Sequence, residues 1–214
     1  MRWRDRIGVT VRRQRQICRL MQLSLVGFFF IGLDRGEPGI VVNSLVALGV
    51  TYLPAVLERD YQIPMDAGLT LWITTAVFLH ALGTLGPYTA VSWWDHVTHV
   101  LSSSVVAATG YAFTRAIDLH TDDIRLPPRF MFAFILLFVV AFGVLWEVIE
   151  FGVGGASAML GTGHVLTQYG LADTMNDLLF DILGGVVVAI WGTAYLTDVV
   201  GAITSRLQAA ERGG

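Results

Sequence analysis

Residues 130–151 read FMFAFILLFVVAFGVLWEVIEF, an apolar run that only Glu147 and Glu150 interrupt. A run of this length can cross the hydrocarbon core of a membrane as a helix, which takes about 20 apolar residues. A carboxylate inside a membrane is costly unless it faces other polar groups. The two glutamates therefore predict a membrane helix that turns a polar stripe toward the interior of a helical bundle.

Two further apolar segments begin with polar residues at helical spacing. One begins with Asp95, His96 and His99, and the other begins with Asp173, Asp177 and Asp181. At about 100° per residue, Asp95 and His99 lie about 40° apart around a helix, and the three aspartates of the last segment fall within about 80°. Each segment thus carries one polar stripe. We expect the three stripes to face one another in a shared site.

The composition of the whole chain is that of an integral membrane protein. Of its 214 residues, 54% are hydrophobic and only 14% are charged, which is more apolar than a soluble domain requires. The net charge of −3 provides no basic surface for nucleic acid, so nucleic acid is not expected as a partner. The single cysteine, Cys18, excludes an internal disulfide and a thiolate metal cluster.

Six apolar segments are long enough to cross a bilayer as helices. They cover residues 17–33, 40–57, 67–85, 95–116, 130–151 and 173–196. The predicted fold is therefore an all-α, polytopic membrane bundle of six transmembrane helices over residues 17–196. An Arg-rich segment, residues 1–16, precedes it as an interfacial helix or a solvated tail, and residues 197–214 follow it as a short amphipathic helix or a frayed end.

The distribution of arginine predicts the orientation of this bundle. Six crossings place both termini on one side, and all arginines except Arg35 fall in segments on that side. Basic residues are in excess in cytoplasmic segments. We therefore expect a multi-pass protein of the cell membrane with both termini in the cytoplasm and its three polar stripes reaching the outer leaflet.

A divalent metal ion would reconcile so many acids in one apolar environment, because converging carboxylates cannot all remain charged without a cation. Mixed carboxylate and imidazole ligands suit Zn, Mn or Fe better than Ca, which takes oxygen ligands only. The predicted ligands are Asp95, His99, Glu147, Asp177 and Asp181. Glu150 and Asp173 are the candidate general bases that would accept a proton from metal-bound water.

Several of these residues also fit plainer structural roles. Asp95 and Asp173 begin their segments, where an Asp often caps the helix N-terminus. Glu150 is near enough to the end of its segment to extend to the aqueous interface. His80, alone on the third segment, is better explained as a hydrogen-bonded packing residue than as a ligand. The Gly-rich connection at residues 152–172 is open to three interpretations, a lid, a re-entrant segment or a loosely packed loop.

The motifs occur in a fixed order, which is Asp95-x3-His99, Glu147-x2-Glu150 and Asp177-x3-Asp181-x2-Gly184. This order resembles that of YjdF-type bacterial inner-membrane proteins and, more loosely, that of VanZ-like membrane proteins, over about residues 90–196. The VanZ-like pattern has Gln in place of Glu150 and Asn in place of Asp181, so the present chain carries two additional acids. The resemblance implies a membrane location and a site at these residues, and it supplies no reaction.

Three classes of function fit the pattern. The first is a metal-dependent intramembrane hydrolase or transferase that acts on a lipid or lipid-linked headgroup, which the crowding of charge in one leaflet favours. The second is an ion- or proton-coupled transporter, although the inner halves of the last three segments are apolar. The third is a structural or regulatory protein whose polar residues only hold the helices together.

Overall fold

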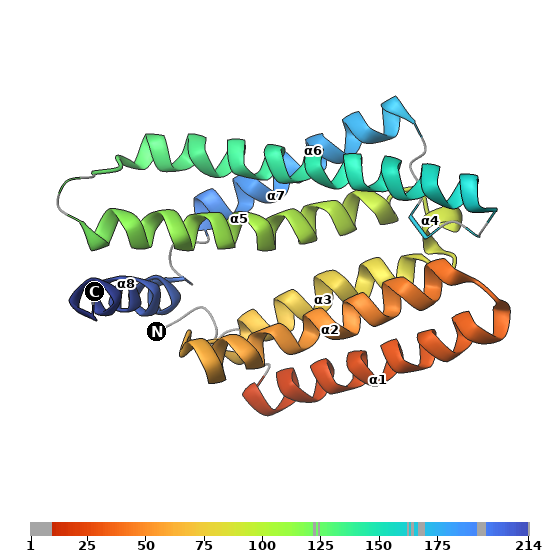
Figure 1. Ribbon diagram of the computed structural model, residues 1–214, viewed down its shortest axis with the longest axis horizontal. Helices are drawn as coiled ribbons and strands as arrows, with labels where there is room; N and C mark the ends of the chain where they lie inside the picture. Colours follow the sequence, from red (N-terminus) through yellow and green to blue (C-terminus); the bar gives the residue numbers. More distant parts are fainter. Residues whose placement is uncertain are drawn as a thin grey trace.

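The computed structural model describes residues 10–121, 123, 125–161, 163, 165–166, 170–191 and 196–213. Over these residues the chain forms eight α-helices and no strand, which confirms the predicted all-α class. The helices, labelled in Figure 1, are α1 (Val11–Arg35), α2 (Pro38–Tyr61), α3 (Ala67–Gly83), α4 (Pro87–Ala90), α5 (Trp94–His120), α6 (Pro128–Leu160), α7 (Leu171–Trp191) and α8 (Thr197–Gly213). Residues 1–9 of the Arg-rich segment lie outside the described residues.

The long helices form two groups. Helices α1, α2 and α3 contact one another in the first group, and α5, α6 and α7 do so in the second (Figure 1). Contacts between α3 and α5 join the groups. A buried apolar cluster fills this junction, with Leu69 from α3, Ala107 and Ala108 from α5, and Ile135 and Val139 from α6. Apolar packing therefore holds the groups together along part of their length.

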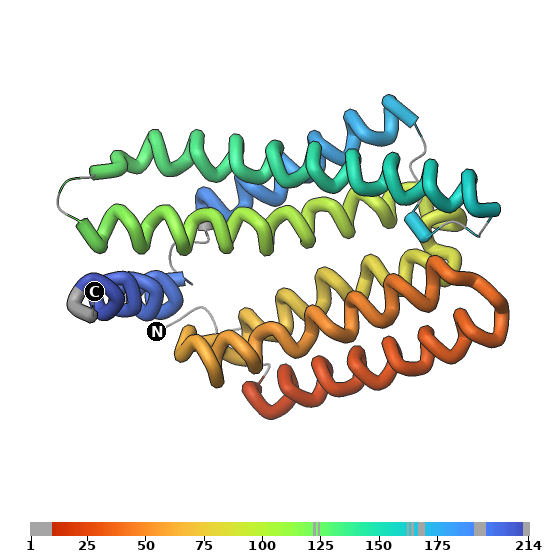
Figure 2. Tube along the Cα trace, viewed as in Figure 1, coloured from red at the N-terminus to blue at the C-terminus, as the bar shows by residue number. Residues whose placement is uncertain are grey.

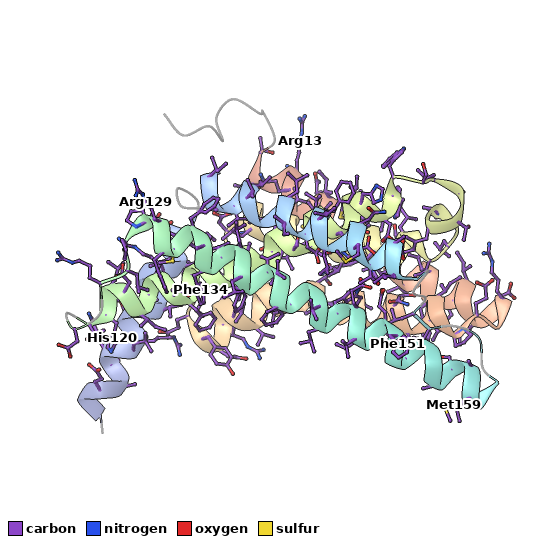
Figure 3. The ribbon with its side chains drawn as sticks, turned by 90° about the horizontal axis from the view of Figure 1, so that it is seen from above. Arg13, His120, Arg129, Phe134, Phe151 and Met159 are labelled. Atoms are coloured by element: carbon purple, nitrogen blue, oxygen red, sulfur yellow. The ribbon has the colours of Figure 1, made fainter. Side chains whose placement is uncertain are left out.

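The two ends of the bundle differ. One end, here called the α4 end, carries the turn between α1 and α2, helix α4 and the last turns of α6 (Figure 2). The opposite end carries the connection between α5 and α6, together with α8. Viewed from above, Phe134, Phe151 and Met159 mark the course of α6 from one end to the other, and His120 and Arg129 lie at the end away from α4 (Figure 3).

Turn chemistry fixes the connection between α1 and α2 at the α4 end. Gly36 ends α1 in the left-handed conformation, with φ 65°, which glycine adopts without steric cost. Pro38 then begins α2, where its missing N–H has no helical partner to lose. The chain therefore reverses within two residues and brings the first turns of α2 close to α3.

Several helix boundaries differ from the predicted ones: α1 begins at Val11 rather than at residue 17, and three further differences concern the polar segments. Helix α5 begins at Trp94 with Trp93 as its N-cap, and α7 begins at Leu171, so Asp95 and Asp173 lie inside the first turn and cap neither helix. Helix α6 continues to Leu160 and ends where Gly161 adopts φ 63°. The expected end of this helix at residue 151 is wrong because no proline or left-handed residue interrupts the chain before Gly161.

Helix α8 makes the C-terminal tail an ordered part of the fold. Its Val200 and Ile203 are buried against Ala112 and Ala116 of α5. The predicted amphipathic helix is thus present, and its apolar face covers α5.

Within the described residues, three helices are long and apolar enough to cross a membrane: α1, α2 and α6. Helix α3 is apolar but shorter. Helices α5 and α7 carry the predicted polar stripes along part of their length, and these two helices pack closely on each other. A Cβ atom at Gly184 of α7 would overlap Ser103 Oγ and the Val100 carbonyl oxygen of α5.

We expect the substitution Gly184→Ala to destabilise the protein by about 1–3 kcal/mol, because the added methyl group forces α5 and α7 apart. Thermal unfolding of the purified protein in detergent measures the effect. The matched control is Gly49→Ala in α2, where a Cβ atom meets nothing within 4 Å. Equal unfolding temperatures for the two variants would contradict the close contact of α5 with α7.

Candidate functional site

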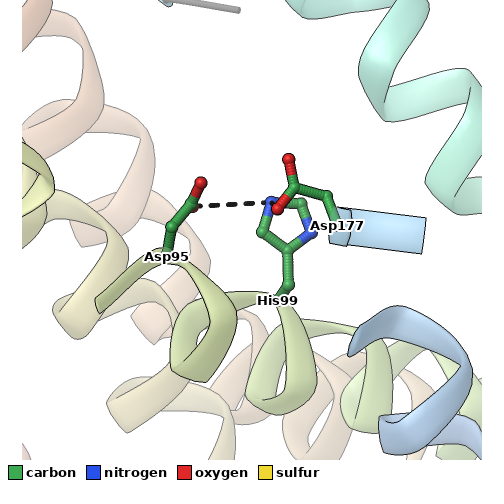
Figure 4. Close-up of side chains that lie close together, drawn as sticks. All are labelled: Asp95, His99 and Asp177. Atoms are coloured by element: carbon green, nitrogen blue, oxygen red, sulfur yellow. Dashed lines mark ion pairs between the residues drawn. The ribbon is translucent and has the colours of Figure 1, made fainter. Parts of the chain in front are cut away.

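Three of the predicted ligands meet at the α4 end of the bundle. Asp95 and His99 lie one turn apart on α5, and Asp177 reaches them from α7 (Figure 4). His99 Nε2 is 3.6 Å from Asp95 Oδ1 and 3.8 Å from Asp177 Oδ1. One ligand atom of each residue lies within 4.8 Å of the other two. The two helices thus bring two carboxylates to the same nitrogen of one imidazole.

These separations fit a bound ion better than direct hydrogen bonds. Hydrogen bonds between nitrogen and oxygen measure about 2.7–3.2 Å, so both contacts of His99 Nε2 are too long. Two ligand atoms that each lie about 2.1 Å from one metal ion are about 3.4 Å apart at the tetrahedral angle. Small rotations of Asp95 and Asp177 would therefore bring all three ligand atoms into the coordination sphere of one ion.

Asp181, which was predicted as a fourth ligand, lies on the other side of the same imidazole. Its Oδ1 is 3.1 Å from His99 Nδ1. An ionised carboxylate only accepts hydrogen bonds, so Nδ1 carries a proton and donates it to Asp181. Nε2 is then left to face Asp95 and Asp177. Metal-binding histidines are commonly held by a carboxylate in this way, and Asp181 accordingly positions His99.

Asp177 has the most demanding environment of the three. The residue is only 2% exposed, and among the described residues its Oδ1 has no hydrogen-bond partner. A buried carboxylate oxygen in that state is costly unless a cation or a proton compensates it. The same oxygen, Asp177 Oδ1, is the atom that lies 3.8 Å from His99 Nε2. The uncompensated oxygen therefore points into the cluster.

Glu147, the remaining predicted ligand, is buried on α6 but stands apart from this group of three. Its Oε2 accepts a hydrogen bond of 2.7 Å from Thr174 Oγ1 of α7. Thr174 precedes Asp177 by about one turn, so Glu147 contacts α7 about one turn closer to the N-terminus of that helix than the cluster does. The contact therefore joins α6 to α7 beside the cluster.

The two candidate bases and His96 occupy different surroundings. Glu150 lines a cavity together with Asp95 and His99, and its Oε1 accepts a hydrogen bond of 3.0 Å from Trp146 Nε1. Asp173 is half-buried in the first turn of α7 and is not among the residues that line this cavity. The His96 ring stacks on Phe180, with 4.1 Å between ring centroids.

The cavity has a volume of about 480 Å³ and lies at the α4 end. We call it the polar cavity because polar side chains from five helices line it, among them Asn43, His80, Tyr88, Asp95, His99 and Glu150. Gly163, Val165 and Leu166 from the connection after α6 also line it. The described part of that connection therefore lies against the cavity, whereas His164 and Tyr169 lie outside the described residues.

A chain of hydrogen bonds that the sequence analysis missed forms another wall of the polar cavity. Asn43 Nδ2 donates to the carbonyl oxygens of Gly39 (2.8 Å) and Val165 (2.9 Å). These two acceptors fix the side-chain amide, so Asn43 Oδ1 faces His80 Nε2 at 3.2 Å. His80 Nδ1 is 2.7 Å from the Tyr88 hydroxyl. Both ring nitrogens of His80 are thus occupied, as expected of a packing residue.

The positions of the protons on His80 and Tyr88 follow from their hydrogen-bond partners. Asn43 Oδ1 only accepts, so His80 Nε2 carries the proton and Nδ1 accepts from Tyr88. Burial raises the pKa of Tyr88 above its ordinary value, so the hydroxyl keeps its proton at neutral pH and remains a donor. The sequence did contain a signal for these hydrogen bonds, because Asn43 is a lone amide in an apolar segment and such groups in membranes need partners.

The family described as predicted membrane protein (DUF2238) matches residues 17–198. The chain belongs to this family. An uncharacterized protein of Thermotoga maritima is similar, with 31% identity over 144 residues that cover 64% of this chain and 68% of the relative. No solved structure matches the chain. The YjdF-type resemblance fits the DUF2238 family loosely, and the family description agrees with the membrane location expected from composition.

We expect Asn43→Leu to lower the unfolding temperature measurably, because it leaves His80 Nε2–H and the Val165 carbonyl oxygen without their partner. Each buried polar group left without a partner lowers the free energy of unfolding by about 1–3 kcal/mol. Asn176→Leu, at an exposed position of α7, is the control and should change the stability little. If both variants unfold at the parent temperature, the chain from Asn43 to Tyr88 makes no contribution to stability.

Proposed function

We propose that the chain is a six-span protein of the cell membrane that binds a divalent metal ion at Asp95, His99 and Asp177. The ion would serve a hydrolase or transferase reaction on a lipid or lipid-linked headgroup. The observation that carries this proposal is the buried Oδ1 of Asp177, which has no hydrogen-bond partner within the described part of the chain and points toward His99 Nε2.

The donor set narrows the identity of the ion. Two carboxylates and one imidazole nitrogen suit Zn, Mn or Fe, whereas Ca takes oxygen ligands only. Three protein ligands leave a coordination position for water or substrate, as in catalytic zinc sites. Asp181 would support such a site from behind, because its hydrogen bond to His99 Nδ1 fixes the ring and increases its basicity.

A bound ion would acidify a coordinated water and polarise the oxygen of an ester. Glu150 lines the same cavity as Asp95 and His99 and is our first choice as general base. In hydrolysis, Glu150 would accept a proton from the water that attacks the carbonyl or phosphoryl centre, and it would pass this proton to the departing oxygen as the ester bond breaks. Asp173, in the first turn of α7, is the second choice for this role.

The arginine distribution supports placing the α4 end at the outer face. Arg35 is the exception among the arginines and lies in the last turn of α1, at the α4 end. Arg125, in the connection between α5 and α6, and Arg129, in the first turn of α6, lie at the opposite end of the bundle. An excess of basic residues marks the cytoplasmic side, so the polar cavity would open outward and both termini would lie inside.

A structural role is the second candidate, because two hydrogen bonds already join the helices without any ion. Asp181 links α7 to His99 of α5, and Thr174 links α7 to Glu147 of α6. A protein in which these contacts only hold the bundle together would contain no stoichiometric metal. Metal content therefore separates the two candidates.

We expect about one divalent ion per chain in the purified parent protein, measured by inductively coupled plasma mass spectrometry. Asp177→Asn and His99→Ala should lose the ion, because each removes a ligand. Asp181→Asn should weaken binding about 10–100-fold, because it leaves the ligands in place and alters the support of His99. The control is Asp198→Asn in the first turn of α8. Undiminished metal in Asp177→Asn would exclude the proposed site.

The orientation is tested by cysteine labelling in a Cys18→Ala background. Ser92 lies exposed before α5, and Asp123 lies exposed between α5 and α6. A membrane-impermeant maleimide should label Ser92→Cys in intact cells and Asp123→Cys only after lysis, because α5 crosses the membrane between them. Labelling of both residues from outside would show that α5 does not cross, and the reverse pattern would invert the bundle.

A further inference from the structure

A second cavity adjoins the polar cavity and has a different lining. Its volume is about 320 Å³. We call it the apolar cavity, because aliphatic and aromatic side chains from α2, α3, α5 and α6 form most of its walls, namely Val46, Val50, Val77, Val106, Val139 and Phe142. Asn43, His80 and His99 line both cavities. The boundary between the polar and apolar cavities therefore lies at Asn43, His80 and His99.

The polar residues in the apolar cavity are largely turned to other partners. Ser103 Oγ donates to the His99 carbonyl oxygen (2.6 Å), and Thr98 Oγ1 donates to the Asp95 carbonyl oxygen (2.8 Å). Asp181 is engaged with His99 Nδ1 (3.1 Å). Hydroxyl groups that are bonded to their own helix offer little to water or to an ion. The lining thus favours a hydrocarbon, because apolar cavities of this kind stay dry.

Two lining residues show where the apolar cavity opens. Val46 of α2 is 60% exposed and Phe142 of α6 is 46% exposed, although both line the cavity. In a membrane, such exposed side chains face lipid. The apolar cavity therefore opens sideways to the bilayer between α2 and α6, whereas the polar cavity lies at the α4 end.

We propose that the apolar cavity holds one hydrocarbon chain of a phospholipid whose polar head lies in the polar cavity. The junction of head and chain then lies beside His99. This assignment rests on the proposed function, and it specifies the substrate of that site as a bilayer lipid that enters between α2 and α6. The two cavities meet beside His99, which is one of the predicted metal ligands. The bond to be broken would therefore be an ester bond at the junction of head and chain.

The dimensions agree with a single chain. Along α5 the apolar cavity extends from Thr98 to Val106, which is about 12 Å at 1.5 Å per residue. The polar cavity, at about 480 Å³, falls within the range of about 300–1,000 Å³ typical of small-molecule sites.

The test uses the full-length protein in phosphatidylglycerol nanodiscs that contain a phosphatidylglycerol with a diazirine at the end of one acyl chain. After photolysis, mass spectrometry of peptides locates the attached lipid. We expect adducts in the α5 peptide that contains Ser102 and Val106, which are only partly exposed. Adducts at Leu20 and Leu23 of α1, which are 64% and 68% exposed, measure the lipid that surrounds the protein.

Two variants block the apolar cavity from different helices. Val50→Phe and Val106→Phe should each lower the α5 adducts about tenfold relative to the α1 adducts, because the larger ring occupies the space of the chain. Val42→Phe is the matched control, because Val42 lies on α2, is exposed, and is not among the residues lining either cavity. It should leave the ratio unchanged. An unchanged ratio in both blocking variants, or no α5 adducts in the parent, would overturn the proposal.

Metal analysis of the same preparations separates this proposal from the one on which it rests. The blocking variants should keep the metal, because neither residue belongs to the cluster, and Asp177→Asn should lose it. If the parent protein contains no metal but forms α5 adducts that Val50→Phe lowers, the metal site is refuted and lipid binding in the apolar cavity is supported. If the parent protein contains stoichiometric metal but forms no α5 adducts, the metal site is supported and lipid binding in the apolar cavity is refuted.

Discussion

The His99 imidazole is the contact on which the rest of the site depends, because carboxylates approach both of its nitrogens. Asp181 accepts from Nδ1, and Asp95 and Asp177 face Nε2. Two of these acids come from α7 and one from α5, so the ring joins the helices as well as the charges. Such an arrangement requires close helix packing, which the absence of a side chain at Gly184 allows.

Several acids in one apolar bundle are compatible with a stable fold only if each finds compensation. Glu147 has Thr174, Glu150 has Trp146, and Asp181 has His99. These pairs give three of the acids a separate partner, whereas the buried Oδ1 of Asp177 has no hydrogen-bond partner within the described chain. A cation beside His99 would compensate this oxygen.

Helical spacing was sufficient to predict which residues of α5 and α7 share a face. It placed Asp95 with His99 and Asp177 with Asp181, and the structure brings the three aspartates to the imidazole of His99. Spacing could not assign Asp181 to Nδ1, because that depends on the rotation and depth of α7 against α5. It also could not place Glu147 beside Thr174, since periodicity within one helix carries no information about the neighbouring helix.

The remaining differences have local causes. The caps of α5 and α7 were misplaced because each helix begins before its first acid, at Trp94 and Leu171, where apolar residues hide the start. The end of α6 was placed too early because the Gly-rich residues after Phe151 were taken to be a connection, whereas Gly161 ends the helix. Asn43 was missed because its side chain carries no charge, although a buried amide in an apolar helix requires partners as well.

The location of the site follows from the division of the bundle into two groups of helices. The cluster belongs to α5 and α7, whereas Asn43 and His80 come from α2 and α3. Both cavities therefore lie at the seam between the groups, where ligands are commonly bound in helical bundles. A seam can change its width without breaking the hydrogen bonds within either group. Entry of a lipid between α2 and α6 would thus be possible while His99 keeps its carboxylates.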